Sequence, residues 1–213
     1  MKNKKTDPLF LKLFDLEPSR RDLRKIEIVL AAIDCIAEVG LELTTFENIA
    51  KRLKTGPSHV AYYFPNKTEI IEAAIKFSLG TAQDITVRNV QKVSSKKEKL
   101  EVIVRSTFEW GRTYPKHALV FLLFQYLGAI DEKRKALHSE IRKVGRDRIV
   151  QVLESHEKST SMSKIKTKRV AHEIQNMTLG NLFESISIDS PYSLKEHEDA
   201  TVKAVFELVR GWF

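Results

Sequence analysis

Four polar side chains suited to nucleic-acid recognition fall on one face of a short predicted helix. They are Ser58, His59, Tyr62 and Tyr63. Their hydroxyl, imidazole and phenol groups can hydrogen-bond phosphates or base edges, or contact a thymine methyl. The flanking basic residues are Lys51, Arg52, Lys54 and Lys67. Glu47 is the one acid between residues 44 and 67, so this stretch carries a local charge of +3 and favours a polyanionic partner. For His59, an exposed position without a base contact is the open alternative.

Two predicted helices precede this face. Apolar residues recur at steps of three and four over residues 24–39, which predicts an amphipathic helix, and Gly40 ends it. A helix of barely two turns follows over residues 46–53. Its cap is either Thr44 with Glu47 or Thr45 with Asn48, since both pairs can satisfy the free amides of a first turn.

The polar face itself belongs to a third short helix. Pro57 suits the first position of this helix, which must end before Pro65. Asn66 caps a long fourth helix over residues 67–93. Three short helices with a tight turn between the second and the third are the layout of a helix-turn-helix DNA reader, so the sequence predicts a DNA-binding domain.

Four blocks of sequence resemble a known family. Residues 28–32 read IVLAA, residues 38–40 EVG, residues 44–50 TTFENIA and residues 63–67 YFPNK. In order and spacing they resemble the N-terminal domain of the tetracycline-repressor (TetR) family of transcriptional regulators, over about residues 24–75. The resemblance implies that Thr45 touches a backbone phosphate, that the third helix reads bases, and that Lys67 holds a phosphate.

The turn and the third helix depart from the family pattern. Family members usually have Gly-Val-Ser, any residue, then Gly-Thr-Leu-Tyr, whereas residues 54–61 read KTGPSHVA. Lys54 therefore stands where a glycine is usual, Gly56 where a capping serine is usual, and Ala61 where a tyrosine is usual. If the turn geometry of the family is retained, Lys54 has a positive φ and is strained, and Gly56 cannot cap the helix through a side chain. We expect a changed operator preference, and the alternative is a degenerate DNA-binding helix of weak affinity.

The rest of the chain is also predicted to be helical, over residues 96–113, 116–127, 132–156, 164–186 and 194–213. Breaks are expected at residues 114–115, 128–131, 157–163 and 189–193, and Ser193 with Glu196 forms a capping box. Strand-like alternation is absent. The predicted fold class is all-α, with an N-terminal helix-turn-helix domain, a C-terminal helical bundle and about nine helices.

Aromatic residues are dense between residues 108 and 126, and at helical spacing they are by default core residues. The resemblance offers a second role, since the same helices would enclose an effector pocket. Its walls would be Phe77, Phe108, Trp110, Phe121 and Phe124. Such a lining suits a small, largely apolar effector.

The last two predicted helices carry apolar faces. They are Val170, Ile174, Met177, Leu182, Phe183 and Ile186 on one, and Val202, Val205, Phe206, Val209 and Trp212 on the other. These faces either pack within the chain or, as the resemblance implies, form a four-helix homodimer interface. A homodimer would present two recognition helices about 34 Å apart to a palindromic site.

The 213 residues carry a formal charge of +8, but the excess is not where the DNA signal lies. Residues 1–80 contribute +2, residues 81–160 contribute +6, and residues 161–213 are balanced. The central excess adds long-range steering or is simply solvated surface.

Several classes of function are disfavoured. One cysteine, Cys35, makes no internal disulfide and is expected to be a buried small side chain, with a redox sensor as the alternative. The histidines lack metal-ligand spacing, and no phosphate loop, nucleophile elbow or paired-carboxylate motif is present, so we expect no metal, no cofactor and no enzyme activity. No apolar run is long enough for a membrane span, and we expect a cytoplasmic protein.

The predicted domains are an N-terminal extension (1–22), a helix-turn-helix domain (23–67) and an effector-binding and dimerisation domain (68–213). The extension has a basic cluster at Lys2, Lys4 and Lys5 and an apolar stretch over residues 9–16 that would dock as an extra helix.

The predicted function is a sequence-specific DNA-binding regulator, a homodimeric repressor released by its effector. The alternative is a helical ligand carrier or protein-interaction module with a degenerate DNA reader.

Overall fold

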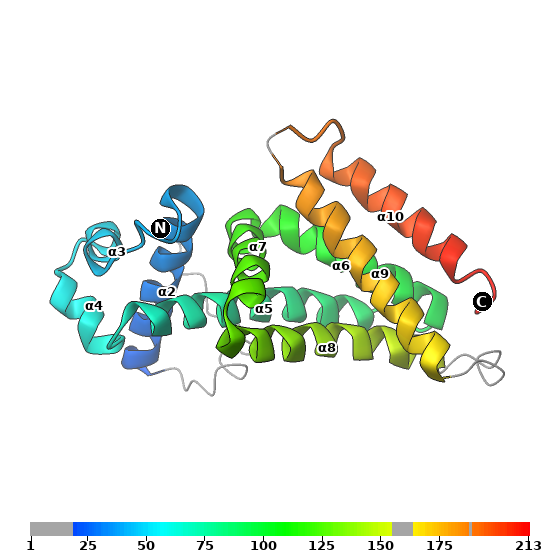
Figure 1. Cartoon of the computed structure of the whole chain (residues 1–213), viewed down its shortest axis with the longest axis horizontal. Coiled ribbons are helices and arrows are strands. Elements are labelled where there is room, and N and C mark those ends of the chain that lie inside the picture. The colour runs from blue at the N-terminus through cyan, green and yellow to red at the C-terminus, as the bar shows by residue number, and fades with distance from the viewer. Residues whose placement is uncertain (1–18, 155–163, 188) are drawn as a thin grey trace. The chain divides into compact units, whose positions relative to one another are not determined.

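The computed structural model describes residues 19–154, 164–187 and 189–213, and within these ranges every regular element is an α-helix (Figure 1). The predicted all-α class is therefore confirmed. The helices are α2 (Arg20–Val39), α3 (Phe46–Leu53), α4 (Pro57–Tyr63), α5 (Lys67–Val90), α6 (Lys96–Thr113), α7 (Pro115–Ile130), α8 (Glu132–Glu154), α9 (Lys164–Ser185) and α10 (Leu194–Leu208). Among these described helices, none combines the length and apolar content that a bilayer crossing needs. The extra helix predicted over residues 9–16 lies outside the described residues.

Local capping decides where several helices begin. Helix α2 starts at Arg20, four residues before the predicted start, because the Ser19 hydroxyl accepts a hydrogen bond from the backbone N–H of Asp22 (3.1 Å). The capping box of Ser193 and Glu196 is confirmed at the start of α10. An equivalent box of Ser95 and Glu98 begins α6, and its Ser-x-x-Glu spacing was visible in the sequence.

The predicted break at residues 128–131 is confirmed at Asp131 alone, because α7 continues through Gly128 to Ile130. Gly128 lets the ring of His138 on α8 lie close to the backbone of α7, since a Cβ atom at residue 128 would be 2.9 Å from that ring. Helix α10 is shorter than predicted and ends at Leu208, after which turns carry the chain to the buried Trp212.

The described residues form two compact units. The first unit comprises residues 19–84 and 116–123, and the second comprises residues 85–115, 124–154, 164–187 and 189–213. In the first unit, α3 packs against α2 and α4. Its buried core residues include Ile28, Ile33, Ile49, Val60 and Ile70. Leu30 belongs to the apolar residues whose spacing predicted the helix over residues 24–39, but it is 40% exposed.

In the second unit, α9 packs against α8 and α10, and α10 also packs against α6. Most of the apolar residues predicted for a dimer interface are buried inside this unit. The buried ones are Val170, Ile174, Leu182, Val202, Val205, Val209 and Trp212. The half-buried ones are Met177, Phe183, Ile186 and Phe206. Packing within the chain therefore accounts for much of both faces.

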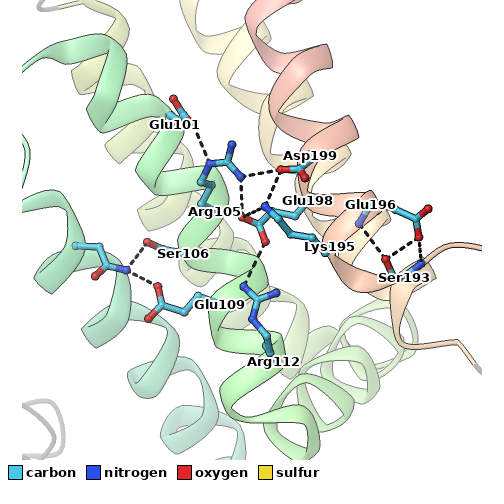
Figure 2. Close-up of polar contacts among 11 residues, drawn as sticks. Glu101, Arg105, Ser106, Glu109, Arg112, Ser193, Lys195, Glu196, Glu198 and Asp199 are labelled. Carbon is cyan, nitrogen blue, oxygen red and sulfur yellow. Dashed lines mark hydrogen bonds and ion pairs between the residues drawn. The ribbon is translucent and has the colours of Figure 1, made fainter.

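A network of charged side chains joins α6 to α10 (Figure 2). The Glu198 carboxylate, 6% exposed, accepts hydrogen bonds from Arg105 (2.8 Å) and Arg112 (3.3 Å). Arg105 also donates to Glu101 and Asp199. Partial burial alone would lower the pKa of Arg105, but its hydrogen bonds to the three carboxylates raise it. The network therefore holds α10 on α6 with compensated charges.

Replacing Glu198 tests the strength of this network. We expect Glu198→Gln to lower the free energy of unfolding by about 2 kcal/mol, because two guanidinium groups lose their shared, buried counter-charge. Glu173→Gln is the matched control, since Glu173 pairs with the exposed Arg169 within α9 and such pairs contribute less than about 1 kcal/mol. Urea denaturation of both variants measures the difference, and equal losses would contradict the prediction.

Candidate nucleic-acid interface

The loop between α2 and α3 orients the first turn of α3. Thr45 is the N-cap, because its Oγ1 accepts the backbone N–H of Asn48 (3.2 Å). Thr44 is buried and donates instead to the carbonyl oxygen of Gly40 (2.8 Å). Of the two predicted caps, the structure uses Thr45 with Asn48. The pKa of Glu47 is lowered by hydrogen bonds from its own backbone N–H and from the Thr45 hydroxyl, so a phosphate contact at Thr45 must compete with that carboxylate.

The turn between α3 and α4 depends on a left-handed backbone at Lys54. Lys54 has φ 54° and ψ 44°, and it is the one non-glycine residue with positive φ in the described ranges. This conformation lets the N–H of Thr55 reach the carbonyl oxygen of Ala50 (3.0 Å) and close the helix. The predicted positive φ at Lys54 is confirmed. Gly56 is the N-cap of α4 and makes no side-chain cap, also as predicted.

Helix α4 turns one side chain fully inward and leaves its polar residues accessible. Val60 is completely buried, Ser58 is exposed, and Tyr62 is 70% exposed. His59 and Tyr63 are half-buried and meet edge to face, with ring centroids 5.3 Å apart. Tyr63 also contacts the Tyr62 ring edge to face at 5.0 Å. The predicted four residues therefore lie together on the accessible side of α4.

The start of α5 lies beside the loop that leads into α3. The Asn66 side chain accepts the backbone N–H of Glu69 (3.0 Å), which confirms the predicted cap. The Lys67 ammonium donates to the carbonyl oxygen of Glu42 (3.1 Å). An ammonium group has three donors, so two remain for a phosphate.

The basic side chains of the first unit divide into paired and unpaired groups. Arg52 pairs with Glu38, and Lys116 pairs with Glu38 (2.7 Å) and Asp34 (2.7 Å). The hydrogen bonds from Arg52 and Lys116 lower the pKa of Glu38 to about 2. Lys51 and Lys54 are exposed, and neither forms an ion pair within the part of the chain that the structure describes. These two lysines, rather than Arg52, are therefore available to a polyanion.

A hollow of about 220 Å³ lies beside the turn in the first unit. It is lined by Arg24, Glu27, Ile28, Leu53, Lys54, Thr55 and His59. Glu27 accepts a hydrogen bond from Arg24 (2.5 Å), which leaves Lys54 as the cationic group of the lining that has no carboxylate partner in the described residues. The sequence did not point to this hollow, because residues 24–28 and 53–59 meet only in the fold.

The five aromatic residues predicted to line an effector pocket are buried. Phe77 and Phe121 belong to the first unit and Phe108, Trp110 and Phe124 to the second, and all five are buried. Their role as effector walls stays a prediction.

Cys35 is 1% exposed, as expected for a buried small side chain. Its sulfur also accepts a hydrogen bond from Arg52 Nε (3.1 Å), a contact that the sequence did not indicate.

Residues 28–74 match the model of the family described as bacterial regulatory proteins, tetR family. This range contains α3, α4, the turn between them and the start of α5, so the match and the geometry coincide. The N-terminal part of the chain, residues 28–74, belongs to the TetR family of bacterial regulatory proteins.

Relatives and solved structures agree with this assignment. HTH-type transcriptional regulator BetI of Proteus mirabilis is 24% identical over 184 residues, covering 85% of this chain and 89% of the relative. BetI of Rhizobium meliloti is 26% identical, but that match spans 51% of this chain and about half (52%) of the relative. A transcriptional regulator of Saccharomonospora viridis in complex with choline has a TM-score of 0.77 at 17% identity, covering 87% and 96% of the two chains. The fatty acid degradation regulator FadR of Bacillus halodurans has a TM-score of 0.72 at 19% identity, covering 95% and 96%. The structural likenesses show a shared fold.

Lys54→Gly tests the left-handed turn of this TetR-family reader. We expect the free energy of unfolding to rise by up to about 1 kcal/mol, because glycine adopts positive φ without the steric cost that a side chain carries. Lys76→Gly, at an exposed position inside α5, should instead lower it by about 1 kcal/mol. Thermal and urea unfolding compare the two, and a loss of stability in both variants would count against strain at Lys54.

The Glu38 pairing predicts a pH dependence. The pKa of Glu38 lies below its ordinary 4.5, so this pairing contributes stability above that pH and loses it as pH falls through about 2. We expect Arg52→Met to move the Glu38 midpoint upward in a carbon-detected NMR titration. Glu98, whose pKa is lowered by the Ser95 hydroxyl and backbone, should titrate unchanged. An unmoved Glu38 midpoint would show that Arg52 does not set it.

Proposed function

We propose that the chain is a sequence-specific DNA-binding repressor, which occupies a palindromic operator as a homodimer and leaves it when a small, largely apolar effector binds. The observation that carries the proposal is the accessible polar face of α4, which follows a tight turn in a TetR-family N-terminal domain. Lys51 and Lys54 lie beside this face, and neither has an ion-pair partner among the described residues. Residues 23–67 would read DNA, and residues 68–213 would bind the effector and pair the two copies.

Each residue of the reader has a proposed role. Ser58, Tyr62 and the accessible edge of His59 contact base edges or phosphates in the major groove. Tyr63 braces the other two rings through its edge-to-face contacts. Lys67 and the Thr45 hydroxyl hold backbone phosphates on either side of α4. The single buried residue Val60 anchors α4 without using its polar face.

A small-molecule effector is supported by the family and by the choline complex of the S. viridis regulator. That complex supports a ligand for this chain as a class, not choline itself. Release by the effector requires that the ligand bind more tightly to a conformation that the operator does not accept. The homodimer would use the surfaces of α9 and α10 that remain after their packing within the chain.

The deciding experiment is selection of DNA fragments by the purified full chain, followed by sequencing. A regulator should enrich one palindromic sequence and keep its preference over random duplex as salt rises. Loss of preference at every salt concentration would favour the ligand carrier or protein-interaction module.

Lys67→Ala gives a finer prediction on the selected operator. We expect affinity to fall and the slope of log affinity against log salt to decrease by about 1, since one phosphate contact is lost. Lys203→Ala is the control, because Lys203 is an exposed lysine of α10 outside the reader. Fluorescence anisotropy across a salt series measures both slopes, and matching slopes for the two variants would refute the phosphate role of Lys67.

A further inference from the structure

Three basic or titratable side chains follow one face of α8 in the second unit. His138, Arg142 and Arg146 are each one helical turn apart, and we call them the α8 basic stripe. Residues 133–148 hold seven basic and two acidic side chains. Helix α8 as a whole holds seven basic and four acidic side chains, so half of the positive excess of residues 81–160 belongs to this helix, outside the DNA-binding domain.

One neutral amide on α7 serves two members of the stripe. The Gln125 oxygen Oε1 accepts hydrogen bonds from His138 Nε2 (2.7 Å) and from Arg142 (3.2 Å). The amide nitrogen Nε2 of Gln125 is buried and has no hydrogen-bond partner among the residues that the structure describes. Flipping the amide would not help, because it would turn the NH₂ group toward the guanidinium of Arg142. A buried donor is thus left beside two basic groups, and it lacks an acceptor.

The remaining partners of the stripe are also uncharged. Arg142 donates to Asn176 Oδ1, and Arg146 donates to Gln175 Oε1 (3.2 Å), both on α9. Within the described residues, no carboxylate bonds to any member of the stripe. Half-buried cations ordinarily have a counter-charge, because neutral hydrogen bonds satisfy the donors but do not neutralise the charge.

The charges on the stripe act against one another. Burial lowers the pKa of Arg142, and the positive charge of Arg146 lowers it further. Burial, Arg142 and Arg146 together lower the pKa of His138. An oxyanion among these groups would remove the repulsion and supply acceptors for the spare guanidinium donors.

Close packing around the stripe fixes the surrounding side chains. A Cβ atom at Gly145 would lie 2.5 Å from Gln175 Nε2, which in turn donates to the carbonyl oxygen of Arg142 (3.0 Å). The ring of the buried Phe124 lies 5.3 Å, centroid to centroid, from that of His138. The amides and the stripe are therefore held by α7, α8 and α9 together, next to one of the aromatic residues expected to line an effector site.

We propose that the α8 basic stripe and the amide of Gln125 bind the oxyanion group, carboxylate or phosphate, of a small molecule. Arg142 and Arg146 donate to the anion, and Gln125 Nε2 supplies a further donor. This deepens the proposed function by assigning an acidic group to the largely apolar effector, and that effector role rests on the proposed function. Binding of the anion to the α8 basic stripe does not depend on the proposed function.

Calorimetric titration of the full chain tests binding. Sodium benzoate represents a carboxylate on an apolar body, inorganic phosphate represents the second source, and benzamide is the neutral control, all at constant ionic strength. We expect saturable binding of benzoate, phosphate or both, and at least tenfold weaker binding of benzamide. Saturation by one anion alone identifies which group the site prefers, and no saturation by either overturns the proposal.

Two variants and a control place the binding at the stripe. Gln125→Glu keeps the shape of the side chain and supplies an internal carboxylate, so we expect a higher melting temperature and at least a tenfold loss of anion affinity. Arg142→Gln should also lose at least tenfold. Arg169→Gln, at an exposed arginine of α9 paired with Glu173, should bind as the unchanged chain does. Undiminished binding by Gln125→Glu would overturn the site even if Arg142→Gln failed to fold.

Release of the selected operator separates this inference from the proposed function. We expect the binding anion to weaken operator affinity in the unchanged chain and not in Gln125→Glu. Anion binding without that effect overturns the effector role. A chain that binds the anion but shows no operator preference refutes the proposed function and leaves the anion site supported by calorimetry.

Discussion

The reading helix depends on the backbone conformation of Lys54. Helix α4 has seven residues and one fully buried side chain, so neither its length nor its own packing can hold it in place. Its direction is set by the left-handed turn that closes α3 through the N–H of Thr55. A lysine at this position accepts a steric cost and places a charge beside α4. Lys54 therefore sets the direction of α4 and also contributes to the positive electrostatic potential around it.

Charge counts alone would have assigned the wrong cations to DNA. The sequence groups Arg52 with the lysines around α4, but Arg52 pairs with Glu38 and bonds the sulfur of Cys35. Lys116, distant in sequence, shares the same carboxylate. Fewer basic groups are therefore available to a polyanion than the sequence count suggests. They are Lys51, Lys54 and the spare donors of Lys67. Pairing is a property of the fold, so composition cannot reveal it.

Features with local causes could be predicted from the sequence. The helices, the caps at Asn66 and Ser193, the positive φ at Lys54 and the accessible side of α4 all follow from residues within a few positions of one another. Features with distant causes could not. The sequence suggested that Gly128 ends a helix, whereas its missing side chain leaves room for the ring of His138. Glu198 pairs with Arg105, from which it is separated by 93 positions in the sequence. The resemblance assigns phosphate contacts to Thr45 and Lys67, and the sequence did not indicate that each also has a partner within the DNA-binding domain.

Two partly buried arginines of the second unit differ in how their charge is compensated. Arg105 is surrounded by three carboxylates, which raise its pKa, whereas Arg142 has neutral amides and a second arginine near it, and its pKa is lowered. The fold can pair a half-buried guanidinium fully, so the charge of the α8 basic stripe, which no carboxylate of the described residues compensates, is specific to that place and favours an external anion. If such an anion weakens operator binding, linkage requires that the operator weaken anion binding by the same factor. That reciprocity holds whatever path joins the two units, because it concerns free energies of binding and not geometry.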